Sequence, residues 1–445
     1  MCYNEIMEKI KLDDNLLSLA KIFKRHGVNL YIVGGFVRNA LLGFCETDID
    51  ICSSLVPEEV FKALYNSQFN CKLVNEELGT IHIYPKNNTG VFYEHTTFRA
   101  ENYAEGGAHC PQNVKFVNDI RQDASRRDFT SNALYLNVLT QEIEDFYDGI
   151  KHTKNKLLKT VETPQIVFSR DGLRILRMVR IASEMDFTIE ENTFKTAKNL
   201  AHQLKDISQE RFNKEIIAIL FSDYKYNSLD NSNSHLRGLK ILGELQAWQY
   251  VLKDFFKSLN PDQKQKFNDI SWKMLEFATP AMRISCLVCD IFNALNLTPT
   301  QENINSLLGT KGIMLNKKEC QKQFTIVSAF FTIKNNTFSN EEGRIFLQQN
   351  YQYLNEIFNL CKIAGIGDKL IKIYDLMKVD KVPFTIKDLQ INGTILQEVY
   401  PELPKNFYGR IFDDLLKLCA IMPELNTRDS LLFTVPDSFY KIKNK

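Results

Sequence analysis

The length, composition and charge of the chain exclude several classes of protein. Its 445 residues are enough for two to four domains with buried cores. A hydrophobic content of 44% and a charged content of 24% are ordinary for a globular protein, and no apolar stretch reaches the length of a membrane span. The formal net charge of +1 excludes a globally basic surface, so nucleic acid could bind only through local basic patches.

The ten cysteines are scattered without regular spacing, and no signal peptide is recognisable at the N-terminus. We therefore expect reduced thiols in a cytoplasmic protein. Cys286 and Cys289 form a CxxC motif inside an apolar, helical stretch with no second pair nearby, which indicates core packing rather than zinc or redox chemistry. His109 and Cys110 also lack a further pair of ligands at metal-site spacing.

The chain is predicted to begin with a helix, a strand and a second helix. Residues 1–28 have the pattern of an amphipathic helix that ends in a turn. The apolar run 30–33 indicates a short buried strand, Gly34 and Gly35 follow it, and 36–42 has helical spacing. Such a turn between a strand and a helix leaves backbone N–H groups free to hold phosphate.

Two aspartates follow this turn within the sequence TDIDI. Residues two apart in a strand point to the same face, so Asp48 and Asp50 are expected to aim their carboxylates at one point. Converging oxygen ligands suit Mg²⁺, which keeps waters and substrate phosphates in its shell. A lone D-x-D is more often a solvated strand edge. A phosphate-holding turn followed by paired carboxylates instead describes a nucleotidyl-transfer site that uses two metal ions.

Further strands are predicted over 78–83 and 91–98, and the second carries Glu94. On a strand next to Asp48 and Asp50, Glu94 would complete a carboxylate cluster; the alternative is a solvated strand residue. The polar segment that follows, residues 99–113, contains two adjacent glycines and a proline and is predicted to be a mobile loop.

A compact basic motif lies in the sequence SRRDFTSN. Arg126 and Arg127 supply two forked donors, and Asp128 supplies an acceptor next to them. Arginine forks bind triphosphate oxygens well, and a carboxylate can accept from a ribose hydroxyl. The alternative is a surface ion pair.

Residues 168–187 are predicted to form one helix with a single apolar stripe. Asp171 and Arg174 are three residues apart and share a face of such a helix, and Arg177 and Arg180 continue near the same side. The bland alternative is an i,i+3 salt bridge on a solvated helix, worth about 0.3 kcal/mol.

The chemical alternative is base selection by Asp171 and Arg174. Cytosine and adenine each present an amino donor beside a ring-nitrogen acceptor, whereas uracil and guanine reverse that order. A carboxylate beside a guanidinium matches the first pattern and leaves buried groups mispaired with the second. The protein would then act as its own template.

These motifs together resemble the family of class II CCA-adding tRNA nucleotidyltransferases and bacterial poly(A) polymerases. The resemblance is strong over residues 28–220 and rests on GGxVR at Gly34, Gly35 and Arg38, DxD at Asp48 and Asp50, YEHTTFR around Glu94, RRDFTSNA from Arg126, and DxxR at Asp171 and Arg174. Two positions depart from the family pattern: Asn39 stands where Asp is usual, and Arg170 stands where Glu is usual.

The resemblance implies an α+β fold, with an N-terminal nucleotidyltransferase (polymerase β-like) mixed sheet and helices followed by an all-α remainder. It divides the chain into a head over 1–150, a helical neck with base recognition over 151–226, a helical body over 227–340 and a tRNA-binding helical tail over 341–445. In the tail, lysines such as Lys387 would meet RNA backbone phosphates.

The resemblance also implies a reaction, which is template-independent addition of CMP and AMP to tRNA 3′ ends. Mg²⁺ would be held by Asp48 and Asp50 with help from Glu94. ATP and CTP would be bound by a set of nucleotide-contacting residues: Gly34, Gly35, Arg38, Arg126, Arg127, Asp128, Asp171, Arg174, Arg177 and Arg180. The expected partner is tRNA, without a membrane or a protein partner.

Three alternatives stay open on the sequence. The first is an enzyme that adds only CC or only A, and the second is a poly(A) polymerase. The third is a catalytically silent RNA-binding protein, against which the intact D-x-D argues. None of the seven histidines is followed by Asp, which excludes a fused phosphohydrolase of the HD type.

Overall fold

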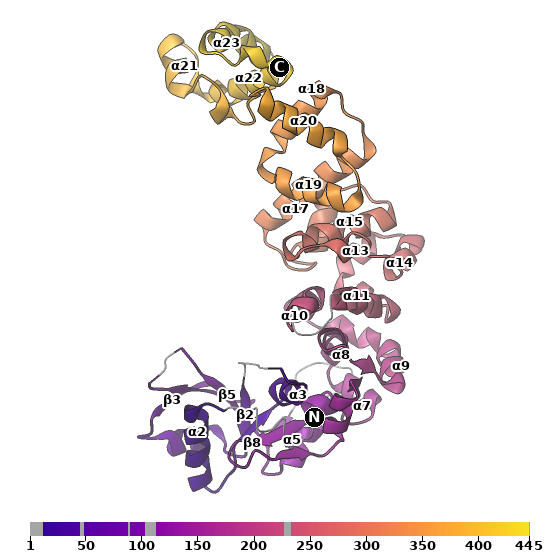
Figure 1. Ribbon diagram of the computed structural model, residues 1–445. Coiled ribbons are helices and arrows are strands. Elements are labelled where there is room, and N and C mark those ends of the chain that lie inside the picture. The colour runs from indigo at the N-terminus through magenta and orange to yellow at the C-terminus, as the bar shows by residue number, and fades with distance from the viewer. Residues whose placement is uncertain (1–11, 45–48, 88–89, 103–112, 227–232, 445) are drawn as a thin grey trace. The chain divides into compact units, whose positions relative to one another are not determined.

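The computed structural model describes residues 12–44, 49–87, 90–102, 113–226 and 233–444 (Figure 1). Asp48, His109 and Cys110 lie outside these residues, as does most of the predicted loop. The chain divides into two compact units, Met1–Ile270 with Thr310–Met314 and Ser271–Gly309 with Leu315–Lys445. Each unit is described on its own.

The first unit contains a seven-stranded mixed sheet in the order β3-β4-β5-β2-β1-β8-β9. Strands β2 and β5 pair in parallel, and the other neighbours are antiparallel. The strands of this unit are β1 Tyr31–Val33, β2 Asp50–Ser53, β3 Phe69–Asn75, β4 Thr80–Pro85, β5 Tyr93–Thr97, β6 Arg99–Asn102, β7 Asn113–Phe116, β8 Leu134–Asn137, β9 Ile143–Asp145, β10 Leu157–Leu158 and β11 Thr188–Ile189.

The α-helices of the first unit surround this sheet and then continue beyond it. They are α2 Asp14–Arg25, α3 Gly35–Leu41, α4 Pro57–Leu64, α5 Ile120–Ser125, α6 Gly149–Lys154, α7 Pro164–Arg170, α8 Leu173–Glu184, α9 Glu191–Asn199, α10 Gln209–Leu220, α11 Ser234–Glu244, α12 Trp248–Val251, α13 Lys253–Ser258 and α14 Pro261–Asn268. The α+β architecture inferred from the sequence is therefore confirmed.

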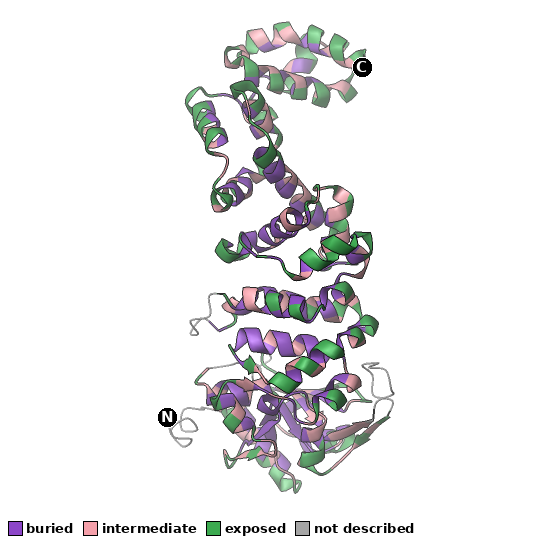
Figure 2. Ribbon diagram, turned by 90° about the vertical axis from the view of Figure 1, so that its right-hand side faces the viewer, coloured by how far each residue is buried: buried purple, intermediate pink, exposed green. Residues whose placement is uncertain are grey.

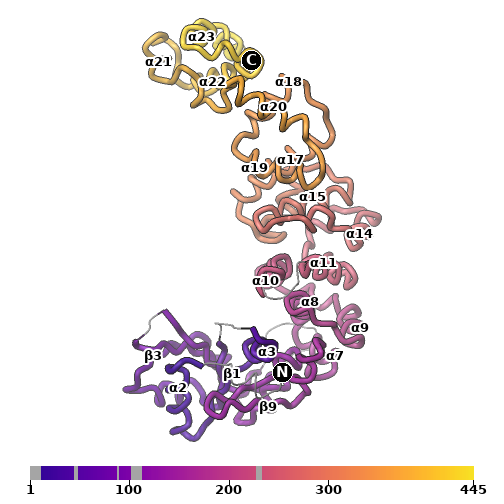
Figure 3. Tube along the Cα trace, viewed as in Figure 1, coloured from indigo at the N-terminus to yellow at the C-terminus, as the bar shows by residue number. Residues whose placement is uncertain are grey.

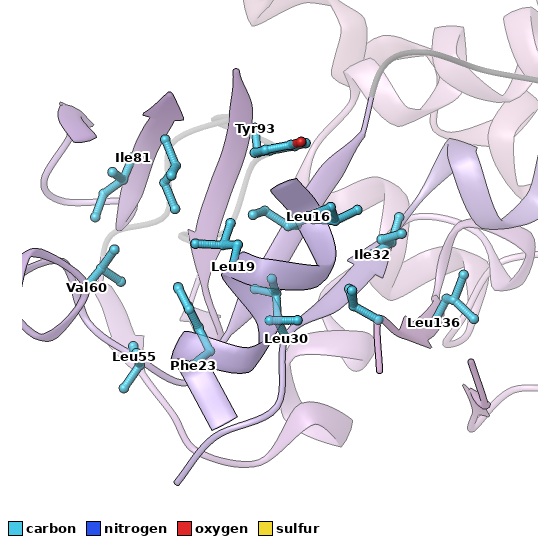
Figure 4. Packing of buried hydrophobic residues seen from close by; sticks show 14 of the residues in the cluster. Leu16, Leu19, Phe23, Leu30, Ile32, Leu55, Val60, Ile81, Tyr93 and Leu136 are labelled. Carbon is cyan, nitrogen blue, oxygen red and sulfur yellow. The ribbon is translucent and has the colours of Figure 1, made fainter. Parts of the chain in front are cut away.

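The larger hydrophobic core of the head lies between helix α2 and the sheet. Asp13 caps α2 by accepting from the Leu16 backbone N–H at 3.0 Å, and the apolar face of the helix, including Leu19 and Phe23, is completely buried. Figure 4 shows these side chains meeting Ile32 and residues of the neighbouring strands. The opposite face of the sheet carries a smaller apolar cluster and also polar residues of the same strands.

The prediction of a loop over 99–113 was wrong at both ends. Residues Arg99–Asn102 and Asn113–Phe116 form strands β6 and β7, which pair antiparallel from Arg99↔Phe116 to Asn102↔Asn113. The polar composition suggested a loop, but antiparallel backbone pairing between these two nearby segments overrides local preference. Residues 103–112 lie outside the described part of the chain.

The single helix predicted over 168–187 was also wrong, because the chain forms two helices there. Helix α7 ends at Arg170 and α8 begins at Leu173, with Asp171 extended at φ −148° and ψ 106° between them. Gly172 permits the break: a Cβ there would lie 2.6 Å from the backbone oxygen of Gln203. Helices α8, α10 and α11 then pack against one another (Figure 3).

The described residues of the second unit form helices and connecting loops without a strand, and buried and exposed residues alternate along its helices (Figure 2). Cys286 and Cys289 are completely buried in its core, which confirms their packing role. No described helix is long and apolar enough to cross a membrane. The α-helices are α15 Arg283–Leu295, α16 Gln301–Leu308, α17 Lys317–Asn335, α18 Asn340–Gln349, α19 Leu354–Ala364, α20 Asp368–Val379, α21 Gly393–Val399, α22 Tyr408–Ile421 and α23 Arg428–Lys443.

Candidate active site

A row of ionisable side chains crosses the face of the sheet opposite the core. Asp50 on β2 is the direct partner of Glu94 on β5, and Glu94 is the partner of His82 on β4. Paired residues in a sheet project to the same face, so the two carboxylates are neighbours. Asp50 is exposed, whereas Ile51 behind it is completely buried. The structure therefore places Glu94 beside Asp50, as expected for a strand over 91–98. Asp48 lies outside the described residues.

Glu94 is both held in place and accessible. Its Oε2 lies 3.2 Å from His82 Nε2, and its side chain remains 45% exposed. The His82 ring stacks on Phe92 with centroids 4.4 Å apart, which fixes the ring against this face of the sheet. Two adjacent carboxylates facing solvent are the kind of oxygen donors that a hard divalent cation takes.

The predicted glycine turn lies directly against this pair of acids. Gly34 has φ +82°, a conformation that side chains rarely adopt, and a Cβ there would lie 4.0 Å from Asp50 Oδ2. Gly35 then begins helix α3. The order of strand, glycine turn and helix is as predicted, and the structure brings the start of this helix close to the Asp50 carboxylate.

Arg38, on α3, is 4% exposed and points inward. Its Nη1 donates to Asn132 Oδ1 at 2.7 Å, and its Nε donates to Asn39 Oδ1 at 3.0 Å. The guanidinium is therefore engaged by two side-chain amides. Asn39 is completely buried and donates to the Tyr226 hydroxyl at 2.8 Å.

Arg126 and Arg127 converge on one buried carboxylate, Asp123, which the sequence reasoning missed. Arg126 Nη2 and Arg127 Nη2 lie 2.8 and 3.2 Å from its two oxygens. Burial raises the pKa of Asp123, but the two arginines outweigh it and bring the pKa down to about 2. Spacings of three and four residues before the arginines could have identified Asp123, because they put it on the same helical face.

The two arginines are also tied to other groups, and they are mostly buried. Arg126 lies 3.2 Å from Glu101 on β6, and Arg127 Nε donates to the Tyr135 hydroxyl at 2.8 Å. Their side chains are only 14% and 16% exposed. The structure thus differs from the surface ion pair given as the alternative.

Asp128 connects the head to helix α8. Its Oδ2 accepts from Arg177 Nε at 2.7 Å, and its Oδ1 accepts from Asn132 Nδ2 at 3.1 Å. Burial pushes the pKa of Asp128 up, but Arg177 and Arg174 together hold that pKa well below its usual value. Asp128 therefore stays ionised although it is only 6% exposed.

Asp171 and Arg174 do not lie on one continuous helix as predicted. Asp171 accepts from the Leu173 backbone N–H at 3.0 Å and from Arg211 Nη2 on α10 at 3.2 Å. Arg174 is 7% exposed and donates to the backbone oxygens of Arg126, at 2.6 Å, and Val167. The helix break separates the two residues, so each is oriented by a different segment of the chain.

Arg180 lines a cavity of about 630 Å³ between α8 and α10. Its Nε donates to Glu215 Oε2 at 2.7 Å, and its Nη1 lies 3.2 Å from Glu184 Oε2. Arg170, which replaces the usual Glu of the family, lies 2.7 Å from Glu162 Oε2. The reversed charge at this position is therefore matched by an acid from the preceding turn.

Among the described residues, no three His, Cys, Asp or Glu side chains are grouped as in a metal site. Asp48 is not one of these residues. The donors that are described, Asp50 and Glu94, fit an oxygen-preferring metal ion, and no nitrogen or sulfur cluster competes with them in that part of the chain.

Comparisons with known proteins agree with this arrangement. Residues 30–159 match the family model of the poly(A) polymerase head domain, and residues 186–231 match the model of a probable RNA- and SrmB-binding site of polymerase A. Among solved structures, the Bacillus stearothermophilus CCA-adding enzyme in complex with CTP is similar at a TM-score of 0.68 and 23% identity, over 96% of this chain and 98% of that one. The Thermotoga maritima CCA-adding enzyme complexed with tRNA is similar at a TM-score of 0.60 and 19% identity, with 98% of each chain covered.

Curated proteins that are similar in sequence are also CCA-adding enzymes. The CCA-adding enzyme of Lactococcus lactis subsp. cremoris (strain MG1363) is 34% identical over 60% of this chain, which spans 65% of that relative's length. The CCA-adding enzyme of Leuconostoc mesenteroides is 32% identical, and the match covers 91% of both chains. With that identity along almost the whole length, the chain belongs to the CCA-adding enzyme family.

Proposed function

We propose that this chain adds CMP and AMP to the 3′ ends of tRNA without a nucleic-acid template. Membership of the CCA-adding enzyme family supports the reaction. The observation that carries the proposal is the pairing of Asp50 with Glu94, next to a glycine turn whose Gly34 lies against the Asp50 carboxylate. Converging acids beside a phosphate-holding turn are what nucleotidyl transfer requires.

Mg²⁺ is the proposed cofactor, held by Asp48 and Asp50 with help from Glu94. When bound, Mg²⁺ supplies the electrostatic help that lowers the pKa of the primer 3′-hydroxyl and stabilises the pyrophosphate leaving group. The role of Glu94 is supported by its 45% exposure beside Asp50. The hydrogen bond with His82 restricts the orientation of the Glu94 carboxylate.

The incoming nucleotide is proposed to lie between the head and helix α8. Asp128 stays ionised and accepts from the ribose, while Arg126, Arg127, Arg177 and Arg180 face the triphosphate. Of these, Arg177 has the most accessible guanidinium, with 36% of its side chain exposed. The others are largely engaged by acids, which fixes their positions before the nucleotide arrives.

Gly34, Gly35 and Arg38 complete the proposed nucleotide-binding set in different ways. The glycines offer backbone N–H groups at the start of α3. Arg38 is buried against Asn132, so its part is to hold the residues that meet the nucleotide.

Base choice is assigned to Asp171 and Arg174. Arg211 Nη2 donates to Asp171, and backbone oxygens accept from Arg174, so the positions of both groups are set by the surrounding chain. Cytosine and adenine match an acceptor beside a donor, and uracil and guanine do not. Because each group is held by its own partners, mispairing with the wrong base cannot be relieved by a small rotation.

The domain division, the tRNA-binding region and the cellular compartment expected from the sequence are also proposals. Head, neck, body and tail over 1–150, 151–226, 227–340 and 341–445 are the proposed working division, with tRNA held by the tail. The cytoplasm is the proposed compartment, which the seven free cysteines among the described residues support.

One gel assay tests the function. The full chain with Mg²⁺ is incubated with tRNA lacking its 3′-terminal CCA, and with CTP, ATP, both or neither. Two cytidines followed by one adenosine are expected when both nucleotides are present. Long adenosine tracts would select a poly(A) polymerase, partial addition would select a CC-only or A-only enzyme, and no addition would contradict the proposal.

A further inference from the structure

We propose that the hydrogen bond between Asn39 and Tyr226 is a positioning contact, which holds the metal-binding strand and the base-selecting helix at their working distance. The inference rests on the proposed function and adds two residues to it. Neither residue reaches the exposed carboxylate row: Asn39 is completely buried and Tyr226 is 8% exposed. Both act through other groups.

The contact is one end of a continuous chain of buried hydrogen bonds. Asn39 Nδ2 donates to the Tyr226 hydroxyl at 2.8 Å, and Asn39 Oδ1 accepts from Arg38 Nε at 3.0 Å. Arg38 Nη1 donates to Asn132 Oδ1 at 2.7 Å, and Asn132 Nδ2 donates to Asp128 Oδ1 at 3.1 Å. Every member is less than a tenth exposed, so water competes little for these bonds.

The chain ends on the helix that carries the base-selecting arginine. Asp128 Oδ2 accepts from Arg177 Nε at 2.7 Å, and Arg177 lies on α8, three residues after Arg174. At the other end, Asn39 lies on α3, and a Cβ on Gly34, the residue before this helix, would lie 4.0 Å from Asp50 Oδ2. One set of hydrogen bonds therefore links α8 to α3, the helix that begins close to Asp50.

Tyr226 fastens α3 from a second direction. It follows α10 and the short 3₁₀ helix Ser222–Tyr224, and its ring lies 5.2 Å from Phe44, just after α3. Helix α3 is thus tied to α8 through Asp128 and to the segment after α10 through Tyr226. Two ties limit rotation of α3 in a way that one tie would not.

The consequence is kinetic rather than a matter of affinity. The contact touches neither nucleotide nor metal, so its loss should leave nucleotide binding nearly unchanged. It should instead let the Asp50 side of the site drift relative to the base-selecting side. A misplacement of about 1 Å can cost about a hundredfold in rate, so a partial loosening is expected to cost about tenfold.

The test uses the full chain with Tyr226→Phe, Asn39→Leu and the double variant. Tyr226→Phe keeps the ring against Phe44 and removes only the hydroxyl. We expect each single variant to lower kcat for CMP addition about tenfold, with KM for CTP changed less than about twofold. Asn39→Leu also removes the acceptor of Arg38 Nε, so the double variant should be no slower than Asn39→Leu alone, which already lacks the bond to the Tyr226 hydroxyl.

Two further variants distinguish positioning from general damage. Asn39→Asp keeps an acceptor for Arg38 and takes a hydrogen bond from the Tyr226 hydroxyl, so kcat should stay within about twofold of wild type. Tyr65→Phe removes a hydroxyl from a side chain that is 79% exposed and should change nothing. If Tyr226→Phe keeps the wild-type kcat per folded molecule, or if kcat falls only in proportion to folded protein, the proposal is overturned.

A second measurement does not depend on turnover. Amide hydrogen exchange should rise in both α3 and α8 of Tyr226→Phe, while the hairpin over 69–85 stays as protected as in wild type. If the wild-type chain adds no nucleotide to tRNA, the proposed function is wrong. The exchange pattern still tests whether the Asn39–Tyr226 bond couples α3 to α8. Exchange that rises in α3 alone, or in neither helix, would overturn the link.

Discussion

The two compact units of this chain treat buried charge differently. In the first unit, the buried carboxylates Asp123 and Asp128 are surrounded by arginine side chains, which hold their pKa values below the usual value. In the second unit, Asp290 is 5% exposed and accepts from the backbone N–H groups of Met274 and Leu275. Burial there raises its pKa to about 6, and the backbone hydrogen bonds only partly offset that.

The difference fits the proposed division of roles, in which nucleotidyl transfer takes place in the first unit and not in the second. A network of arginines and acids is costly to bury and, once paired, stays rigid and ionised, which is useful where a triphosphate must be met by fixed charges. A lone acid held by backbone amides stabilises a local turn and offers no cation to a ligand. The variants that follow test whether chemistry resides in the first unit alone.

The largest effect is expected from the same substitution made in each unit. Asp50→Asn should lower kcat by about a thousandfold because it removes one of the carboxylates proposed to hold the metal ion. Asp290→Asn should leave kcat per folded molecule near the wild-type value. Single-turnover CMP addition measures both, and an Asp50→Asn enzyme that keeps more than a tenth of wild-type activity would contradict the assignment.

The next effect is a pH dependence of opposite sign in the two units. The pKa of Asp290 is about 6 in the folded chain, above its usual 3.8, so its stabilising contribution is fully present below 3.8 and is lost as pH rises through 6. The loss between pH 4 and pH 7 amounts to about 2 kcal/mol, because one pKa unit is worth about 1.4 kcal/mol and part of the contribution is already lost at pH 4. Hydrogen exchange of α15 in wild type and Asp290→Asn measures the difference.

For Asp128 the sign reverses. Its pKa is depressed, so its contribution is present above the usual carboxyl value and is lost only as pH falls below that value. Exchange in α8 should therefore not depend on Asp128 between pH 5 and pH 7. If exchange in α8 changed with pH in the same direction as exchange in α15, the predicted difference between the two units would be wrong.

A smaller loss of stability is expected when the Asp128–Arg177 pair is broken. Asp128→Asn should lower the free energy of unfolding of the first unit by about 2 kcal/mol, less than for a pair buried on both sides because Arg177 is 36% exposed. Asp186→Asn is the matched control, since Asp186 is 52% exposed beside Arg237 and should cost under about 1 kcal/mol. Urea unfolding compares them, and equal losses would refute the buried role of Asp128.

The smallest effect concerns the orientation of Asp171. Arg211→Gln removes the cation that lies 3.2 Å from Asp171 Oδ2. Discrimination between CTP and UTP should fall about fivefold, because the bond is partly exposed and worth about 1 kcal/mol. Turnover with CTP should persist. Unchanged discrimination would mean that Asp171 does not need Arg211 in order to select the base.

Local motifs allowed much of the head to be predicted from the sequence. Contacts between residues distant in the sequence could not be predicted in this way. The glycine turn and the strand that carries Glu94 follow from short-range patterns, and the register then brings Glu94 to Asp50. The helix break at Asp171 and Gly172 was missed because hydrophobic spacing continues across it, whereas the backbone of Gln203, which leaves no room for a Cβ at Gly172, is about thirty residues away in the sequence.

The same reason explains which parts of the site were missed. Asp171 meets Arg211 across 40 positions, and Asn39 meets Tyr226 across 187. No sequence periodicity connects residues so far apart. From the sequence alone, each of them could equally have been a solvated side chain. Motifs thus identified the candidate reactive groups, and only the fold showed which residues hold them.

The most direct measurement of the central claim is the ratio of kcat/KM for CTP to that for UTP, in wild type, Asp171→Asn and Arg174→Gln. If the first unit separates base choice at these two residues from chemistry at Asp50, both variants should lose at least about tenfold of the ratio and still turn over CTP. Loss of turnover with the ratio unchanged would contradict that separation.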